Sequence, residues 1–134
     1  MHVLDASALL KLVLDEPGSP AFRSWYAERA GEEFVAPALL FTEVGRSLQR
    51  ARLAAHGDAK PRMHALLLGN VRLEADFAAA GAVERVWAAL AASELTFMDA
   101  QYLALAQARK APLVTADRGL AEAARRLDVA VVAA

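Results

Sequence analysis

Residues 113–117 read Leu-Val-Thr-Ala-Asp, a short apolar run that ends in a carboxylate immediately before a helical stretch. Residues 3–5, Val-Leu-Asp, repeat this arrangement near the other end of the chain. Short apolar runs of this kind are typical of strands buried on both faces, and a helical pattern follows each of them. Apolar strands that alternate with helices predict an α/β fold, a three-layer α/β/α arrangement around a parallel sheet.

The hydrophobic pattern along the chain predicts five strands and seven helices. The strands are expected near residues 2–5, 33–36, 71–75, 112–116 and 129–132. The helices are expected near residues 7–14, 19–30, 38–54, 59–69, 79–92, 97–110 and 118–127. No repeat, linker or change of composition marks a second domain, so residues 1–134 are expected to form a single domain.

The composition excludes several classes of protein. The chain is 57% hydrophobic, which is too apolar for a disordered protein, and it contains no cysteine for a disulfide framework, a zinc–thiolate site or a thiol nucleophile. It has neither an apolar run long enough to span a membrane nor a basic stretch ahead of its first apolar run. We expect a soluble, cytoplasmic protein. A net charge of −1 gives no general affinity for nucleic acid, so such contacts would need local patches or bound metal.

Two carboxylates, Asp5 and Asp117, stand at the carboxyl ends of predicted strands. A carboxylate at such a position is costly unless it is paired, hydrogen-bonded or bound to metal. Each of these residues also precedes a predicted helix and could be its N-cap, although Ser7 could cap the first helix instead. Capping and a functional role therefore both remain open for these two acids.

Two further carboxylates, Glu43 and Asp99, lie in the early turns of predicted helices. Glu43 falls at the edge of its helix's apolar stripe, with Arg46 and Arg50 on the same side, so a solvated Glu–Arg pair is the alternative to a functional role. Asp99 follows Thr96 at the spacing of a capping box, so a capping role is the alternative there.

The predicted topology brings the four acids to one edge of the sheet. Helices in this architecture run antiparallel to the strands, so helix starts and strand ends meet at the carboxyl edge, where ligands bind. Clustered carboxylates repel one another, and a divalent cation would relieve that repulsion. Oxygen ligands favour Mg²⁺ or Mn²⁺ over Zn²⁺, and the isolated His2, His56 and His64 are interpreted as ordinary surface or edge residues. The predicted metal ligands are Asp5, Glu43, Asp99 and Asp117.

At these acids the chain resembles a PIN-domain ribonuclease, and more narrowly the VapC toxins of bacterial toxin–antitoxin pairs. The matching pieces lie in order: Val-Leu-Asp-Ala-Ser at residues 3–7, Pro37 followed by Glu43-Val44, Leu-Thr-Phe-Met-Asp-Ala-Gln-Tyr-Leu-Ala-Leu-Ala at residues 95–106, and Leu-Val-Thr-Ala-Asp at residues 113–117. Met98 stands where a tyrosine is common in the family, but all four acidic positions are filled.

The resemblance implies a Rossmann-like PIN fold, a metal-dependent endoribonuclease, a homodimer and a cognate VapB-like antitoxin. Its four acids would be catalytic, holding one or two Mg²⁺ ions that activate a water for in-line attack on the RNA phosphodiester. Ser7 and Thr115 would support the carboxylates, with helix capping and strand-end hydrogen bonding as the alternative. Arg46 and Arg50 are candidates for RNA phosphate contacts, with a plain surface role as the alternative.

Other functions fit the sequence less well. A response-regulator receiver would need a late lysine at a strand end, but Lys110 lies in a predicted helix, and no Gly-x-Gly-x-x-Gly or P-loop motif is present. The main alternative is a PIN-like module that binds RNA or protein without cleaving it. Residues 19–30 and 59–69 carry more apolar side chains than one small sheet needs, so either dimer or antitoxin contacts cover them or they pack in the core.

Overall fold

The computed structural model describes residues 1–50, 59–74 and 81–134, apart from the side chain of Leu68. The elements in chain order are β1 (His2–Leu4), α1 (Ala6–Val13), α2 (Ser19–Ala27), β2 (Phe34–Pro37), α3 (Leu39–Arg50), α4 (Ala59–Gly69), β3 (Val71–Glu74), α5 (Ala82–Ala92), α6 (Phe97–Arg109), β4 (Leu113–Thr115), α7 (Arg118–Arg126) and β5 (Val131–Ala133). None of the helices in these ranges is long and apolar enough to cross a membrane.

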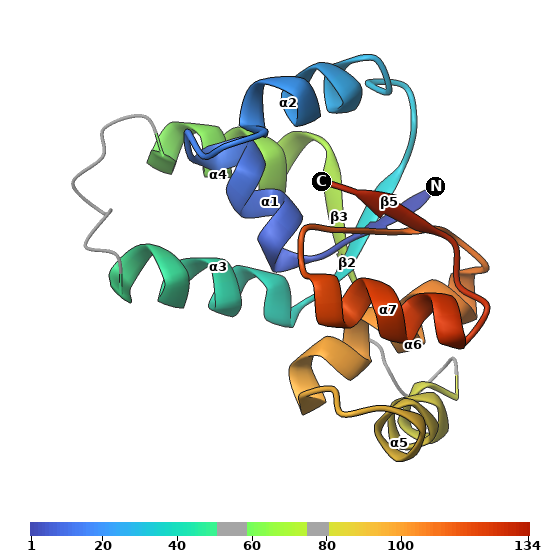
Figure 1. Ribbon diagram of the computed structural model, residues 1–134. Coiled ribbons are helices and arrows are strands. Elements are labelled where there is room, and N and C mark those ends of the chain that lie inside the picture. Colours follow the sequence, from blue (N-terminus) through green and yellow to red (C-terminus); the bar gives the residue numbers. More distant parts are fainter. Residues whose placement is uncertain (51–58, 75–80) are drawn as a thin grey trace.

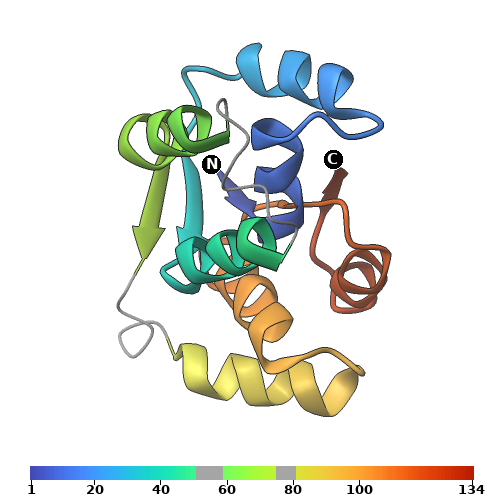
Figure 2. The ribbon, with the colours of Figure 1, turned by 90° about the vertical axis from the view of Figure 1, so that its left-hand side faces the viewer.

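The five strands form one parallel sheet in the order β3-β2-β1-β4-β5. The connections from β1 to β3 carry α1–α4, and those from β3 to β5 carry α5–α7. These two groups of helices lie on opposite sides of the sheet (Figures 1 and 2). The predicted α/β/α fold with five parallel strands is therefore confirmed. The chain turns in opposite directions on the two sides of the β1–β4 pair, and such a switch point leaves a crevice at the carboxyl ends of the strands.

The central strands are short and completely covered. Val3 and Leu4 of β1, and Leu113 and Val114 of β4, have no exposed surface. These residues are apolar because helices lie over both faces of a parallel sheet, so that no side of a central strand meets water. The buried β1–β4 pair gives the residues that follow these two strands fixed positions.

The last strand begins later than the sequence predicts. Residues 129–132 are predicted as a strand, but β5 starts at Val131. Asp128 adopts a left-handed conformation with φ 58°, and the Val129 N–H donates to the carbonyl of Ala124 in α7. The Val129 N–H is thus bonded to the end of α7 and is not available to the sheet, so the strand starts later. The predicted helix residues 51–54 and 79–80, and the predicted strand residue 75, lie outside the described residues.

Residues 19–30 and 59–69, for which partner contacts and core packing were both open, contribute apolar side chains to the core. Phe22 and Tyr26 of α2 are buried, and Met63, Leu66 and Leu67 of α4 pack against the core cluster. Helix α5 carries two exposed apolar side chains, Val83 and Trp87; it packs on α6 and lies at the end of the molecule opposite α2 (Figures 1 and 2).

Candidate functional site at the carboxyl edge of the sheet

A cavity of about 290 Å³ opens at the carboxyl edge of the sheet. All four predicted acids line it, together with both predicted phosphate-binding arginines. The lining residues are Asp5, Ala6, Ser7, Leu10, Glu43, Arg46, Ser47, Arg50, Met98, Asp99, Tyr102 and Asp117. Side chains separated by more than a hundred residues in the chain thus meet in one place, as the topology predicts.

Asp5 is the buried member of this group, with only 4% of its surface exposed. It is the N-cap of α1, and its Oδ1 accepts the Ala8 N–H at 2.8 Å. The Ser7 hydroxyl donates to the carboxylate at 2.8 Å, and the Thr115 hydroxyl donates to its Oδ2 at 2.7 Å. Burial raises the pKa of Asp5 to about 6, although these hydrogen bonds lower it, and the negative charge of Asp117 adds to the rise. The carboxylate is therefore held in place, and no cationic side chain of the described ranges is among the groups that shift its pKa.

Ser7 and Thr115 join Asp5 to the β4–α7 turn. The Ser7 hydroxyl oxygen accepts the Ala116 N–H at 2.9 Å, and the Thr115 hydroxyl oxygen accepts the Asp117 N–H at 2.9 Å. Each hydroxyl thus donates to the buried carboxylate and accepts from the turn that carries Asp117. Both the predicted support of the carboxylates and the alternative of strand-end hydrogen bonding describe these contacts.

Asp117 is exposed and is the N-cap of α7, where its Oδ1 accepts the Leu120 N–H at 2.9 Å. Capping and cavity lining therefore coexist in this residue, as they do in Asp5. An acid at a helix N-terminus is stabilised by the helix dipole as well as by the cap hydrogen bond. The two interpretations that the sequence left open are compatible.

Glu43 and Asp99 form the other side of the cavity. Glu43, on α3, is half-buried, and the Tyr102 hydroxyl donates to its Oε2 at 2.5 Å. Burial raises the pKa of Glu43, the Tyr102 hydrogen bond and Arg46 lower it, and the charge of Asp99 raises it further. Asp99 lies in the first turn of α6: its N–H donates to the Thr96 hydroxyl at 3.1 Å, and that hydroxyl donates to its Oδ2 at 2.7 Å. The predicted cap is present, beside the cavity.

Tyr102 is a cavity residue for which the sequence alone predicted no role. Its position one turn after Asp99 on α6 was a signal, because residues three apart on a helix share a face. A phenol on a buried helix face also needs a hydrogen-bond partner, and here that partner is a carboxylate.

The chemistry of the donor set fits a hard divalent cation. The side chains that face the cavity offer carboxylate and hydroxyl oxygens. The charge of Asp117 raises the pKa of Asp5, and the charge of Asp99 raises the pKa of Glu43. Within residues 1–50, 59–74 and 81–134, however, no three acidic or histidine side chains are grouped closely enough to hold one ion by themselves.

The histidines of the described ranges do not line this cavity. His64 is exposed, and His56 lies outside the described residues. The interpretation of His2 as an ordinary edge residue was incomplete, because its ring stacks on Phe34 with a centroid distance of 5.3 Å and meets Trp25 edge-on at 5.5 Å. Aromatic packing, not ligation, accounts for its place at the start of β1.

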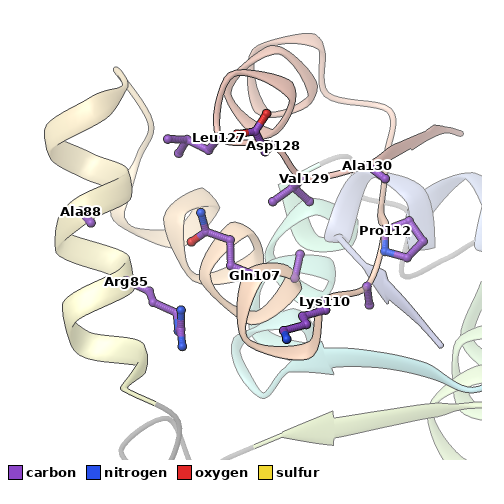
Figure 3. Close-up of a pocket in the computed structure, with 11 residues that line it drawn as sticks. Arg85, Ala88, Gln107, Lys110, Pro112, Leu127, Asp128, Val129 and Ala130 are labelled. Atoms are coloured by element: carbon purple, nitrogen blue, oxygen red, sulfur yellow. The ribbon is translucent and has the colours of Figure 1, made fainter.

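A larger cavity, of about 570 Å³, lies at the opposite, amino edge of the sheet (Figure 3). Its walls are the ends of α6 and α7, the residues before β4 and β5, and one side of α5. The labelled side chains include Arg85, Gln107, Lys110 and Asp128, with apolar residues between them. It has one acid, where the carboxyl-edge cavity has four.

A doubly wound α/β domain with an acidic cavity at the carboxyl edge is the class of protein that this fold and site define. The PIN-domain family model matches residues 2–126. The ribonuclease VapC35 of Mycobacterium tuberculosis is 33% identical over 138 residues, which cover 99% of this chain and 96% of that protein. The chain belongs to the PIN-domain family.

Solved structures show the same fold. PAE2754 from Pyrobaculum aerophilum superposes with a TM-score of 0.67 at 22% identity, covering 98% of this chain and 87% of that one. A toxin–antitoxin complex from Klebsiella pneumoniae gives a TM-score of 0.63 at 20% identity, with 90% of this chain and 91% of that one covered.

Proposed function

We propose that this chain is a Mg²⁺- or Mn²⁺-dependent endoribonuclease, the toxin of a type II toxin–antitoxin pair that acts in the cytoplasm. The observation that carries the proposal is the meeting of four acids from separate elements in one cavity beside two arginines. The family assignment and the relative named as a ribonuclease support the same conclusion.

The proposed metal ligands are Asp5, Glu43 and Asp99, with Asp117 as a fourth that binds directly or through water. Because no three acids of the described ranges are grouped around one point, bound water would complete the contacts of some of them with one or two ions. A bound cation would supply a Lewis acid for the phosphate and lower the pKa of the attacking water. Asp117 is the most exposed of the acids, and as a helix cap its carboxylate is already occupied by one hydrogen bond, so contact through water suits it.

The remaining cavity residues orient the acids or attract the RNA. Ser7 and Thr115 hold the Asp5 carboxylate in one orientation and keep the turn bearing Asp117 at a fixed distance from it. Arg46 and Arg50, one helical turn apart on α3 and both exposed, can each bind an RNA phosphate beside the acids. Their charge offsets the repulsion between four carboxylates and a polyanion.

An antitoxin and a second copy of the chain are the proposed partners. The Klebsiella pneumoniae complex supports the first. For the second, Val83, Trp87 and Phe97 are 53%, 61% and 55% exposed, and the Trp87 and Phe97 rings lie 6.1 Å apart. These side chains present roughly 300 to 400 Å² of apolar surface, enough for the centre of an interface that buries about 800 Å² per subunit. A dimeric mass is expected by light scattering, and a monomer at working concentration would contradict the dimer.

The function is tested by replacing Asp5 with asparagine, which keeps the size and the cap acceptor but removes the charge. Asp5→Asn should reduce Mg²⁺-dependent RNA cleavage by on the order of 100-fold or more. The matched control is Asp128→Asn, the same change at the amino-edge cavity, which should cleave at the wild-type rate. If Asp5→Asn cleaves like the wild type, the proposed site is wrong. A wild-type chain that binds RNA and never cuts it would favour the non-enzymatic module.

A further inference from the structure

Tyr102 is buried at the wall of the acidic cavity, with 1% of its surface exposed. It is the largest of the fully buried side chains in the described ranges. Its hydroxyl donates to Glu43 Oε2 at 2.5 Å and so links α6 to α3 across 59 positions of sequence. A buried hydroxyl without a partner is costly, so this bond fixes both groups.

Glu43 needs such a partner more than Asp5 does. The Asp5 carboxylate is short and accepts hydrogen bonds from Ser7, Ala8 and Thr115. The side chain of Glu43 is longer, with one more rotatable bond, so holding it in one conformation costs more rotamer entropy. Among the contacts that the structure gives for Glu43, the Tyr102 hydroxyl is the hydrogen-bond donor.

Helix α6 determines the positions of two of the four acids. Asp99 and Tyr102 are three residues apart, so they share one face of α6, and both line the cavity. The helix packs against β1 and β2, the strands that lead to Asp5 and to α3. Its register therefore places Asp99 directly and Glu43 through the phenol.

We infer that Tyr102 is a positioning residue, one that holds the Glu43 carboxylate by Oε2 so that Oε1 is presented to the divalent cation. This inference rests on the proposed metal-dependent function. It predicts that losing the hydroxyl alone weakens metal binding, and that it does so only through Glu43.

The test is Mn²⁺ binding by calorimetry on the full chain without RNA. Tyr102→Phe should weaken Mn²⁺ binding by on the order of 10-fold, because it removes an outer partner of a ligand. Tyr26→Phe is the matched control: it removes the hydroxyl of the chain's other tyrosine, on α2 and away from this cavity, and should bind Mn²⁺ like the wild type. In cleavage assays, Tyr102→Phe should need more Mg²⁺ for half-maximal rate and recover most of its kcat at saturating Mg²⁺.

A double-mutant cycle separates positioning from a structural role. Glu43→Asp pulls the carboxylate back from the phenol, so adding Tyr102→Phe to it should weaken Mn²⁺ binding no further. Equal losses from Tyr102→Phe with glutamate or aspartate at position 43 would overturn the inference. So would wild-type Mn²⁺ affinity in Tyr102→Phe while Glu43→Asp is weakened. That result leaves the proposed function standing, whereas a wild-type chain that binds no Mn²⁺ overturns both. Glu43→Asp keeps Tyr102, so its own loss of binding is informative even if Tyr102→Phe is poorly folded.

Discussion

The two edges of the sheet carry cavities of opposite character. The amino-edge cavity of Figure 3, of about 570 Å³, is the larger of the two compared, and it is walled by helix ends, turns and scattered polar side chains. The carboxyl-edge cavity, of about 290 Å³, gathers four acids and two arginines. Convergent charge, not volume, distinguishes a site for chemistry from a space between packed elements.

Helix polarity explains why the acids gather at one edge. The N-termini of α1, α6 and α7 lie at the carboxyl edge, and Asp5, Thr96 and Asp117 cap them. At the amino edge the helices end instead, and left-handed residues such as Lys110 and Asp128 close the turns. Carboxylates are stable at helix starts because of free N–H groups and the helix dipole. Two of the four acids of the proposed site, Asp5 and Asp117, are therefore themselves helix caps.

Burial shifts the pKa of a titratable side chain at each end of β1. Burial lowers the pKa of His2 at the amino end, against the opposing effect of Glu32, and burial raises the pKa of Asp5 at the carboxyl end. Each group favours its neutral form in the folded chain. The aromatic rings around His2 favour its neutral form. The ionised form of Asp5 is destabilised by burial, and a bound cation would stabilise it.

The largest expected effect of removing the buried charge at the carboxyl edge is on the free energy of unfolding without metal. The pKa of Asp5 is about 6 in the folded chain, against an ordinary value of 3.8. As pH rises, Asp5 therefore ionises in the unfolded state before it ionises in the folded state. Stability from this group is thus present below about pH 4 and lost as pH rises through about 6, a cost of about 3 kcal/mol at neutral pH. In chelator at pH 7.5, Asp5→Asn should be more stable than the wild type by up to that amount.

Urea unfolding of both proteins at pH 7.5 and pH 4 measures this difference. The advantage of Asp5→Asn should vanish at pH 4, and Asp128→Asn should follow the wild type at both values. An Asp5→Asn variant that is less stable than the wild type at pH 7.5 would show that burial of the carboxylate carries no such cost.

A smaller effect is expected on RNA affinity. Arg46→Met and Arg50→Met remove charges from the carboxyl-edge cavity, and each should weaken RNA binding in chelator by about 3- to 10-fold. The slope of log affinity against log salt should fall by about 0.7 for each lost phosphate contact with a single strand. Lys110→Met makes the same kind of change at the amino edge and should leave both quantities unaltered. Equal losses of RNA affinity from the Arg46, Arg50 and Lys110 variants would mean that RNA has no preference for the carboxyl-edge cavity.

Much of the fold and the membership of the site followed from the sequence. Apolar runs ending at Asp5 and Asp117 predicted buried parallel strands, because a strand covered on both faces admits few polar residues. The parallel topology then sent four distant acids to one edge, since helix starts and strand ends must meet there. The start of β5 was predicted wrongly because Asp128 makes a left-handed turn that local hydrophobicity does not reveal.

The tertiary structure decided what the acids contact. Sequence spacing could not show that Ser7 and Thr115 bridge Asp5 to the turn of Asp117, because those bonds join residues over a hundred positions apart. Nor could it pair Tyr102 with Glu43, or show that Val83 and Trp87 of α5 are exposed. Sequence determined which residue types reach the carboxyl edge, because strand and helix periods are local properties. The partners and burial of each carboxylate depend on how separate elements pack, and only the folded chain specifies that.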